Sequence, residues 1–317
     1  MKLVKIFIII LLITSCNNKN NNIPTIAFID AFEDNTIAKA KQGFFDALKK
    51  NGFSEEQKTI HIIYRNAQGN IPTLTQIVQY AISEKVNCIA TCPSISTITA
   101  IQNVKDIPVF MMVSPIPELM KINTKDGKAP TNLFGVGEDL SYIDTSFGLI
   151  TKLLKKEKIK VGMIFNQSEP QSVEALNRIK TLAQELNIEL ITLPVNSSAE
   201  TQLVTLSLLS KNIDAFFANP DNVVFASFET IIQSCNNAKV PVFTSEAGLV
   251  ARGAVAAYGA DMYTWGYQAG EQAAKYLKTK STKELKWQMV EKRTKVYNSK
   301  VAQQYGIIVG EGFEKMD

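Results

Sequence analysis

Ten short apolar runs recur along the chain, and this rhythm restricts the fold more than any other feature of the sequence. The runs are rich in Val, Ile and Phe and lack strict alternation, which is typical of parallel strands buried on both faces. They are TIAFID from Thr25, TIHIIY from Thr59, VNCIAT from Val86, IPVFMMV from Ile107, LFGV from Leu133, IKVGMIF from Ile159, IELITLPV from Ile188, IDAFFA from Ile213, VPVFT from Val240 and AVAAY from Ala254. Amphipathic helical patterns separate them, so the sequence predicts an α/β fold with doubly wound parallel sheets.

The length of the chain predicts two such sheets. Roughly 295 residues remain after an N-terminal leader, more than one core comfortably holds, and the runs fall into two sets of five. We expect two lobes joined by a hinge. Residues 24–138 plus 259–284 would form lobe 1, and residues 139–258 plus 285–317 would form lobe 2.

A late helical pattern from Asp261 to Lys278 decides how often the chain passes between the lobes. Gly266, Gly270 and Ala274 stand in it at four-residue steps, and such a row of small residues lets a helix lie close to a neighbour. We place this helix back on lobe 1. The chain would then cross between the lobes at three hinge segments, which are Gly135 to Asp139, Tyr258 to Asp261 and Thr279 to Leu285.

The N-terminus indicates export. A basic start is followed by the apolar run Ile6 to Ile13, which is too short to span a bilayer and is typical of a signal peptide. Thr14-Ser15-Cys16 then resembles the lipobox of bacterial lipoproteins. We therefore expect residues 1–15 to be a signal peptide, and residues 16–23 to be a lipidated Cys16 with a polar tether. The alternative is an ordinary cleaved signal whose cysteine is accidental.

The composition argues against an enzyme, a metal protein or a nucleic-acid-binding protein. His61 is the only histidine and stands in a strand pattern, so neither a Ser-His-Asp nor a Cys-His pair is expected elsewhere. Cys88, Cys92 and Cys235 lack the spacing of a disulfide framework or a zinc site. The net charge is +4, charged residues of both signs are mixed along the chain, and no stretch interleaves basic with aromatic residues. We expect no catalytic residue, metal or cofactor, and no nucleic-acid partner.

The candidate site lies where the strands end, because ligands of open parallel sheets bind beyond the carboxyl ends of the strands. In the first half, Thr91, Ser94 and Ser96 stand where a helix begins, and hydroxyls with free N–H groups favour a carboxylate. In the second half, Asp221 and Glu246 suit an ammonium. Phe32, back in the first half, could form an apolar wall. A zwitterionic amino acid would satisfy both ends. The alternative is that these residues are only helix caps and turn formers.

Several stretches resemble the ABC transporter substrate-binding family that includes tryptophan- and tyrosine-binding members on the type I periplasmic-binding-protein fold. They are GFFDALKKNGF (43–53), NAQGN (66–70), DIPVF (106–110), NQSEPQSVEAL (166–176), NPDNVV (219–224), VARGAVAAYGADMYTWGYQAGEQAAKYL (250–277) and VYNSKVAQQYGI (296–307). Together they cover nearly the whole chain after the leader. The resemblance implies a protein that closes around its ligand and delivers it to a permease and an ATPase.

Carried over by position, the resemblance implies a ligand rim on both lobes. It comprises Phe32, Glu33, Thr91, Ser94, Ser96, Asn166, Glu169, Ser172, Asp221 and Glu246, with Ser114 beside it. Two departures bear on ligand identity. Glu33-Asp34 stands where members usually have Glu-His, and Ser114-Pro115 stands where they usually have Asp-Pro. Ser168 and Gln171 have the spacing of a capping box at the start of a helix.

We therefore expect a non-enzymatic, extracytoplasmic lipoprotein that binds a small molecule for an ABC importer and contacts the membrane only through its lipid. An aromatic or other hydrophobic amino acid is the favoured ligand. Two alternatives stay open. The ligand could be nucleoside- or sugar-like, or the chain could be a sensor subunit that presents its ligand to a receptor kinase instead of a permease.

Overall fold

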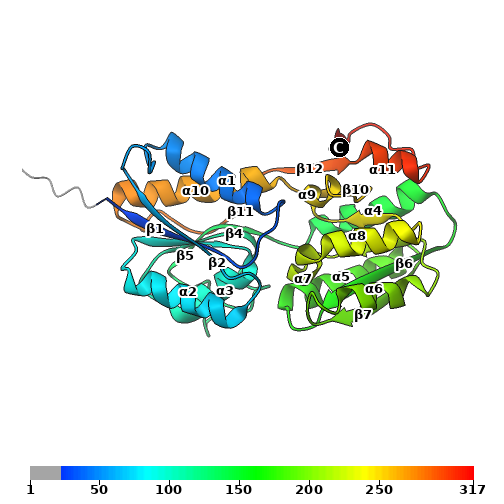
Figure 1. The fold of residues 1–317 in the computed structure, drawn as a ribbon, viewed down its shortest axis with the longest axis horizontal. Helices are drawn as coiled ribbons and strands as arrows, with labels where there is room; N and C mark the ends of the chain where they lie inside the picture. The colour runs from blue at the N-terminus through cyan, green and yellow to red at the C-terminus, as the bar shows by residue number, and fades with distance from the viewer. Residues whose placement is uncertain (1–22) are drawn as a thin grey trace, which may run out of the picture.

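The computed structural model of the chain describes residues 23–317 and consists of two α/β lobes (Figure 1). The predicted signal peptide, the lipidation of Cys16 and nearly all of the predicted tether lie outside the described residues. Each of the ten apolar runs forms a strand, and the two large sheets are parallel throughout. The prediction of two doubly wound parallel lobes is confirmed.

Lobe 1 is built on a six-stranded parallel sheet in the order β11-β5-β4-β3-β1-β2. Its strands are β1 (Thr25–Asp30), β2 (His61–Asn66), β3 (Cys88–Cys92), β4 (Val109–Pro115), β5 (Leu133–Glu138) and β11 (Gln288–Met289). The central strands β1, β3 and β4 are almost wholly buried, because helices cover both faces of the sheet. Helices α2 (Ile71–Ser83) and α3 (Ser94–Asn103) cover one face.

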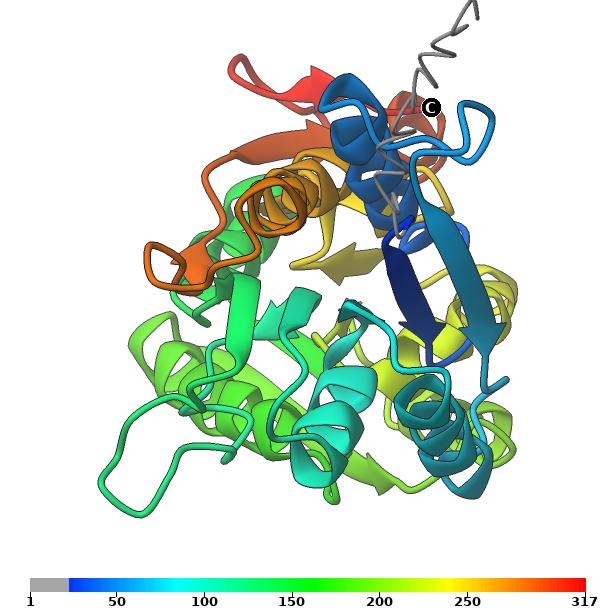
Figure 2. The same ribbon diagram turned by 90° about the vertical axis from the view of Figure 1, so that its left-hand side faces the viewer.

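The other face of this sheet carries α1 (Ala38–Lys50) and α10 (Met262–Thr279), which lie side by side although they are far apart in the sequence (Figure 2). The expected row of small residues explains their close contact. A Cβ atom at Gly266 would lie 1.8 Å from the Ala40 carbonyl oxygen, and one at Gly270 would lie 2.5 Å from that of Phe44. The predicted return of this late helix to lobe 1 is confirmed.

Lobe 2 is built on a four-stranded parallel sheet in the order β7-β6-β8-β9. Its strands are β6 (Ile159–Asn166), β7 (Ile188–Val195), β8 (Ala215–Ala218) and β9 (Val242–Thr244). Helices α4 (Tyr142–Leu154) and α5 (Pro170–Glu185) pack together, as do α6 (Thr201–Leu209) and α8 (Phe228–Asn237). Two short helices, α7 (Asn222–Ala226) and α9 (Ala247–Val250), follow β8 and β9 and lie toward lobe 1.

The C-terminal part of the chain completes lobe 2 with a small sheet in the order β10-β12-β13. Strand β10 (Ala256–Ala260) pairs antiparallel with β12 (Arg293–Tyr297), and β12 pairs parallel with β13 (Glu314–Lys315). Helix α11 (Ser299–Gln304) lies between β12 and β13 in sequence. The C-terminus therefore ends on lobe 2 (Figure 1).

The chain crosses between the lobes three times, and the third crossing lies later than the sequence predicts. Strand β11 pairs with β5 of lobe 1, and the Gln268 side chain donates a hydrogen bond to the Met289 carbonyl at 3.0 Å. Lobe 1 thus continues to Met289, beyond the expected boundary at residue 284, and the chain crosses before Arg293 instead of at Thr279 to Leu285. A two-residue strand carries too little periodicity to be seen in the sequence.

Candidate ligand-binding cleft

The carboxyl ends of the two parallel sheets face each other across a cleft that contains two chambers. The first, which we call the inner chamber, is lined by Ser94, Glu246 and Trp265 among others and has a volume of about 50 Å³, room for a few water molecules. The second, the outer chamber, is lined by Phe32 and Glu169 among others and has a volume of about 350 Å³. Residues from both lobes line each chamber, as the sequence leads us to expect for this fold.

A polar cluster separates the chambers and joins the lobes. The Ser94 hydroxyl of lobe 1 accepts hydrogen bonds from Gln171 Nε2 at 3.3 Å and Asn222 Nδ2 at 3.0 Å, both of lobe 2. The Glu169 carboxylate lies behind these amides and accepts from Gln171 Nε2 at 2.7 Å and Asn166 Nδ2 at 3.0 Å. Burial, with a contribution from the nearby Asp221 charge, raises the pKa of Glu169 to about 8. The cluster is thus a buried contact between the lobes.

Two acidic side chains in the inner chamber differ in their partners. Both oxygens of Glu138 accept from Arg293, at 2.8 and 2.6 Å, so that its charge is compensated although burial raises its pKa. Glu246 accepts only from the Tyr142 hydroxyl, at 2.8 Å, and has no cationic partner among the described residues. Burial raises the pKa of Glu246 to about 7. Glu246 is therefore a buried carboxylate able to bind a cationic group.

Other polar atoms at the inner chamber also lack partners. Gln171 lines the chamber, and its Oε1 atom is buried without a hydrogen bond. Across the chamber, α3 begins at Ser94, and the described residues provide no acceptor for the N–H group of Ser94, which lines this chamber, or for that of the next residue, Ile95, which lines the outer chamber. The chamber therefore offers acceptors on lobe 2 and donors on lobe 1. Such an arrangement suits a ligand that carries a cationic donor and an anionic acceptor.

Asp221 does not have the free carboxylate that the sequence suggests. Its Oδ1 caps α7 by accepting from the N–H groups of Val223 and Val224, at 2.8 and 3.1 Å. Its Oδ2 accepts from the Asn166 N–H at 2.6 Å and the Ser172 hydroxyl at 2.5 Å. Asp221 borders the inner chamber, but all four bonds lie within lobe 2. The geometry therefore favours Glu246, rather than Asp221, as the carboxylate available to a ligand.

Several hydroxyls expected at the rim bond within their own lobe. Thr91 and Thr97 share a hydrogen bond of 2.9 Å, and the Ser96 hydroxyl donates to the Cys92 carbonyl at 3.0 Å. The Ser114 hydroxyl donates to the Met112 carbonyl at 3.1 Å, although Ser114 also lines the inner chamber. Of the candidate hydroxyls on lobe 1, Ser94 and Ser114 line the inner chamber, while Thr91 and Ser96 lie behind it.

The remaining candidates divide between the outer chamber and the surface. Phe32, Asn166 and Glu169 line the outer chamber, whereas Glu33 is exposed and lines neither chamber. The expected capping box does not form. Helix α5 is capped at Glu169 without a side-chain bond, and Gln171 points its amide at Ser94 and Glu169. Gln171 thus bonds to Ser94 across the cleft and to Glu169 within lobe 2, instead of taking part in a cap of its own helix.

Sequence reasoning missed several side chains of the inner chamber, among them Glu138, Leu140, Tyr142, Phe225 and Trp265. Tyr142 and Trp265 stand in the first turns of α4 and α10, the helices that directly follow the first and second crossings. Glu138 ends β5 just before the first crossing. For Glu138, Tyr142 and Trp265, the position beside the crossings is the signal that could have found them, because crossing segments border both lobes; Phe225 in α7 lies beside no crossing.

Two parallel lobes, several crossings and a ligand-sized set of polar groups between the lobes define a two-lobed solute-binding protein. The family model described as ABC transporter substrate binding protein matches residues 25–316. The chain therefore belongs to the ABC transporter substrate-binding protein family. It is a binding protein and not an enzyme, its partners are a small-molecule ligand and an ABC transporter, and it acts outside the cytoplasm.

Similar proteins agree with this family. A tyrosine-binding protein from Clostridioides difficile (strain R20291) is 32% identical over 249 residues, which cover 78% of this chain and 71% of that protein. The crystal structure of a conserved domain protein from Vibrio cholerae has a TM-score of 0.84 and 26% identity, and covers 93% of this chain and 100% of its own. Within residues 23–317, no helix has both the length and the apolar character needed to cross a membrane.

Two further solved structures share the two-lobed fold of this chain. A domain from Streptococcus pneumoniae in complex with L-Trp has a TM-score of 0.81 at 21% identity, covering 91% of this chain and 96% of its own. The ligand-free, open structure of a substrate-binding protein with adhesive properties from Clostridium difficile has a TM-score of 0.67 at 25% identity, covering 93% and 100%. The hydrogen bonds that Gln171 and Asn222 of lobe 2 donate to Ser94 of lobe 1 show that the lobes are closed on each other here.

Proposed function

We propose that this chain is the extracytoplasmic solute-binding lipoprotein of an ABC importer and that it captures an aromatic or other hydrophobic amino acid in the inner chamber. One observation carries the ligand class. The unpaired polar atoms at the chamber are acceptors on lobe 2, in Glu246 and Gln171, and backbone donors on lobe 1, at the start of α3. An α-amino acid has an ammonium for the first set and a carboxylate for the second.

The remaining wall of the chamber supports an aromatic or apolar side chain on the ligand. Tyr142, Phe225 and Trp265 contribute aromatic rings, and Leu140 adds an aliphatic surface. The tyrosine-binding relative is consistent with this preference. A closed volume of about 50 Å³ is far below the roughly 300 Å³ or more of most ligand sites. Binding therefore requires the lobes to part and to close again around the ligand.

Membrane attachment through Cys16 is part of the proposal and rests on the N-terminal sequence. A basic start, an apolar segment and small residues before a cysteine are together typical of exported lipoproteins. A lipid at Cys16 and the polar residues that follow would tether the lobes beside the permease. Delivery of a captured ligand then needs only short-range diffusion.

Thermal melting with candidate ligands tests the proposed function. A ligand that binds only the folded protein raises stability by about 2.7 kcal/mol at a hundred times its Kd. We expect L-tyrosine, L-tryptophan or L-phenylalanine to raise the melting temperature, and arabinose, ribose and nucleosides to leave it unchanged. Tyramine lacks the carboxylate and N-acetyl-L-tyrosine lacks the ammonium, so neither should replace L-tyrosine.

A pair of matched variants tests the role assigned to Glu246. Glu246→Gln keeps an acceptor for the Tyr142 hydroxyl but removes the charge, so it should abolish the shift with amino acids and leave the ligand-free melt intact. Glu33→Gln removes an exposed carboxylate outside both chambers and should bind normally. A shift with sugars but not with amino acids, or normal binding by Glu246→Gln, would contradict the proposal.

A further inference from the structure

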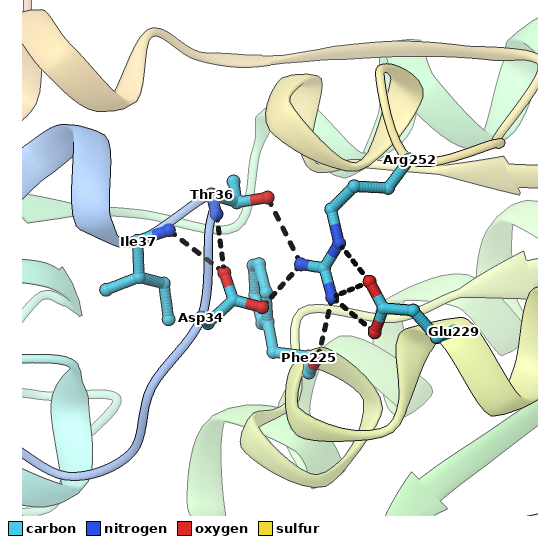
Figure 3. Close-up of polar contacts among 6 residues, drawn as sticks. All are labelled: Asp34, Thr36, Ile37, Phe225, Glu229 and Arg252. Atoms are coloured by element: carbon cyan, nitrogen blue, oxygen red, sulfur yellow. Dashed lines mark hydrogen bonds and ion pairs between the residues drawn. The ribbon is translucent and has the colours of Figure 1, made fainter.

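We propose that Arg252 of lobe 2 and Asp34 of lobe 1 form a latch that holds the cleft closed (Figure 3). We further propose that Gly248 and Thr36 set how closely the lobes approach beside this latch. Asp34 and Thr36 lie in the loop between β1 and α1, and Gly248 and Arg252 lie in and just after α9. None of these residues lines either chamber. The latch therefore does not depend on which ligand the chain binds.

Lobe 2 orients the Arg252 guanidinium before it meets lobe 1. Its Nε and Nη2 atoms donate to the two carboxylate oxygens of Glu229 in α8, at 2.9 and 2.8 Å. The group also lies over the Phe228 ring, 5.3 Å from the ring centroid. These contacts remain when the lobes separate. The remaining edge, at Nη1, is therefore offered to lobe 1 with little loss of conformational entropy on closing.

Lobe 1 supplies an equally well-ordered partner. Asp34 Oδ1 accepts from the N–H groups of Thr36 and Ile37, at 2.8 and 3.0 Å, and its Oδ2 accepts from Arg252 Nη1. Arg252 Nη1 also donates to the Thr36 hydroxyl at 3.2 Å (Figure 3). The Asp34 side chain is 2% exposed and that of Arg252 is 14% exposed, so water screens this pair far less than a surface ion pair. Closing the cleft makes the pair, and opening it breaks the pair.

A second contact at the same place is steric. A Cβ atom built on Gly248 would lie 2.0 Å from Thr36 Cγ2, far inside van der Waals contact. Gly248 does not have a positive φ, so its backbone accepts an alanine. In an open cleft Thr36 moves away with lobe 1 and the added methyl group is free. Gly248→Ala should therefore act as a wedge that penalises only the closed arrangement and leaves every charge in place.

Distances between the lobes in solution test the latch without any ligand. Spin labels at Tyr80→Cys in α2 and Leu203→Cys in α6 occupy exposed positions on opposite lobes, in a full-length Cys16→Ser background. The cysteines that the structure describes are buried and should stay unlabelled. We expect Asp34→Asn, which keeps an acceptor for the N–H groups of Thr36 and Ile37 but loses the charge, to lower the ratio of closed to open protein about tenfold, equivalent to ~1.4 kcal/mol. Gly248→Ala should do the same.

Two controls separate the latch from a general loss of structure. Glu33→Gln removes an equal charge from the same loop of lobe 1, at an exposed side chain that does not meet Arg252, and it should leave the distance distribution unchanged. Thr36→Ser removes Cγ2 but keeps the hydroxyl, so it should restore closure in the Gly248→Ala background. Unchanged distances in Asp34→Asn, equal opening in Glu33→Gln, or lobes that are already fully apart in the ligand-free parent protein would overturn the proposal.

Discussion

Replacement of Asp221 by alanine should destabilise the fold, although Asp221 stands at the edge of the ligand cleft. The change removes the cap of α7, which typically contributes about 0.5–2 kcal/mol. It also leaves the Asn166 N–H and the Ser172 hydroxyl without their charged acceptor, at a further cost of about 1.5–3 kcal/mol. Three of the four bonds are buried and the fourth is part-buried, so we expect a total loss of about 2–5 kcal/mol in the free energy of unfolding.

Urea unfolding of the ligand-free protein, with linear extrapolation to water, measures this loss. Glu33→Ala is the matched control, because it removes an exposed carboxylate at another strand end and should change stability by less than about 0.5 kcal/mol. From the sequence alone, Asp221 would be an exposed charge whose removal costs less than about 1 kcal/mol. A loss of that size, together with abolished ligand binding, would refute the reasoning from the structure and restore Asp221 as a ligand contact.

Two further predictions concern the membrane anchor and the effect of pH. Cys16→Ser should move the full-length protein from the detergent phase to the aqueous phase in a partition assay, because it removes the thiol that would carry lipid; unchanged partition would argue against a lipobox. The affinity for L-tyrosine, measured by calorimetry, should increase as pH rises through about 7, since Glu246 must lose its proton to pair with an ammonium. Glu246→Gln should show no measurable binding on either side of pH 7, and a flat profile in the parent protein would contradict the assignment.

The sequence by itself determined the architecture, because the signals for it are local. Runs of Val, Ile and Phe without alternation specify buried parallel strands, and nine of the ten lie in the two parallel sheets; the tenth forms β10, which pairs antiparallel with β12. The small residues at Gly266 and Gly270 even place a late helix on the first lobe, since only a close neighbour requires them. The boundary at the third crossing was missed because strand β11 is two residues long and is held by pairing with a distant strand.

The site depended on the tertiary structure, because a carboxylate at a strand end can either be taken up by hydrogen-bond donors of its own lobe or stay available to a ligand. Asp221 and Glu246 both follow short strands of lobe 2, and nothing in their neighbours along the chain separates them. Donors from β6 and α5 occupy Asp221, whereas Glu246 meets only the Tyr142 hydroxyl. Which carboxylate stays available is therefore decided by the hydrogen-bond donors that folding brings from elsewhere, and burial then sets its pKa.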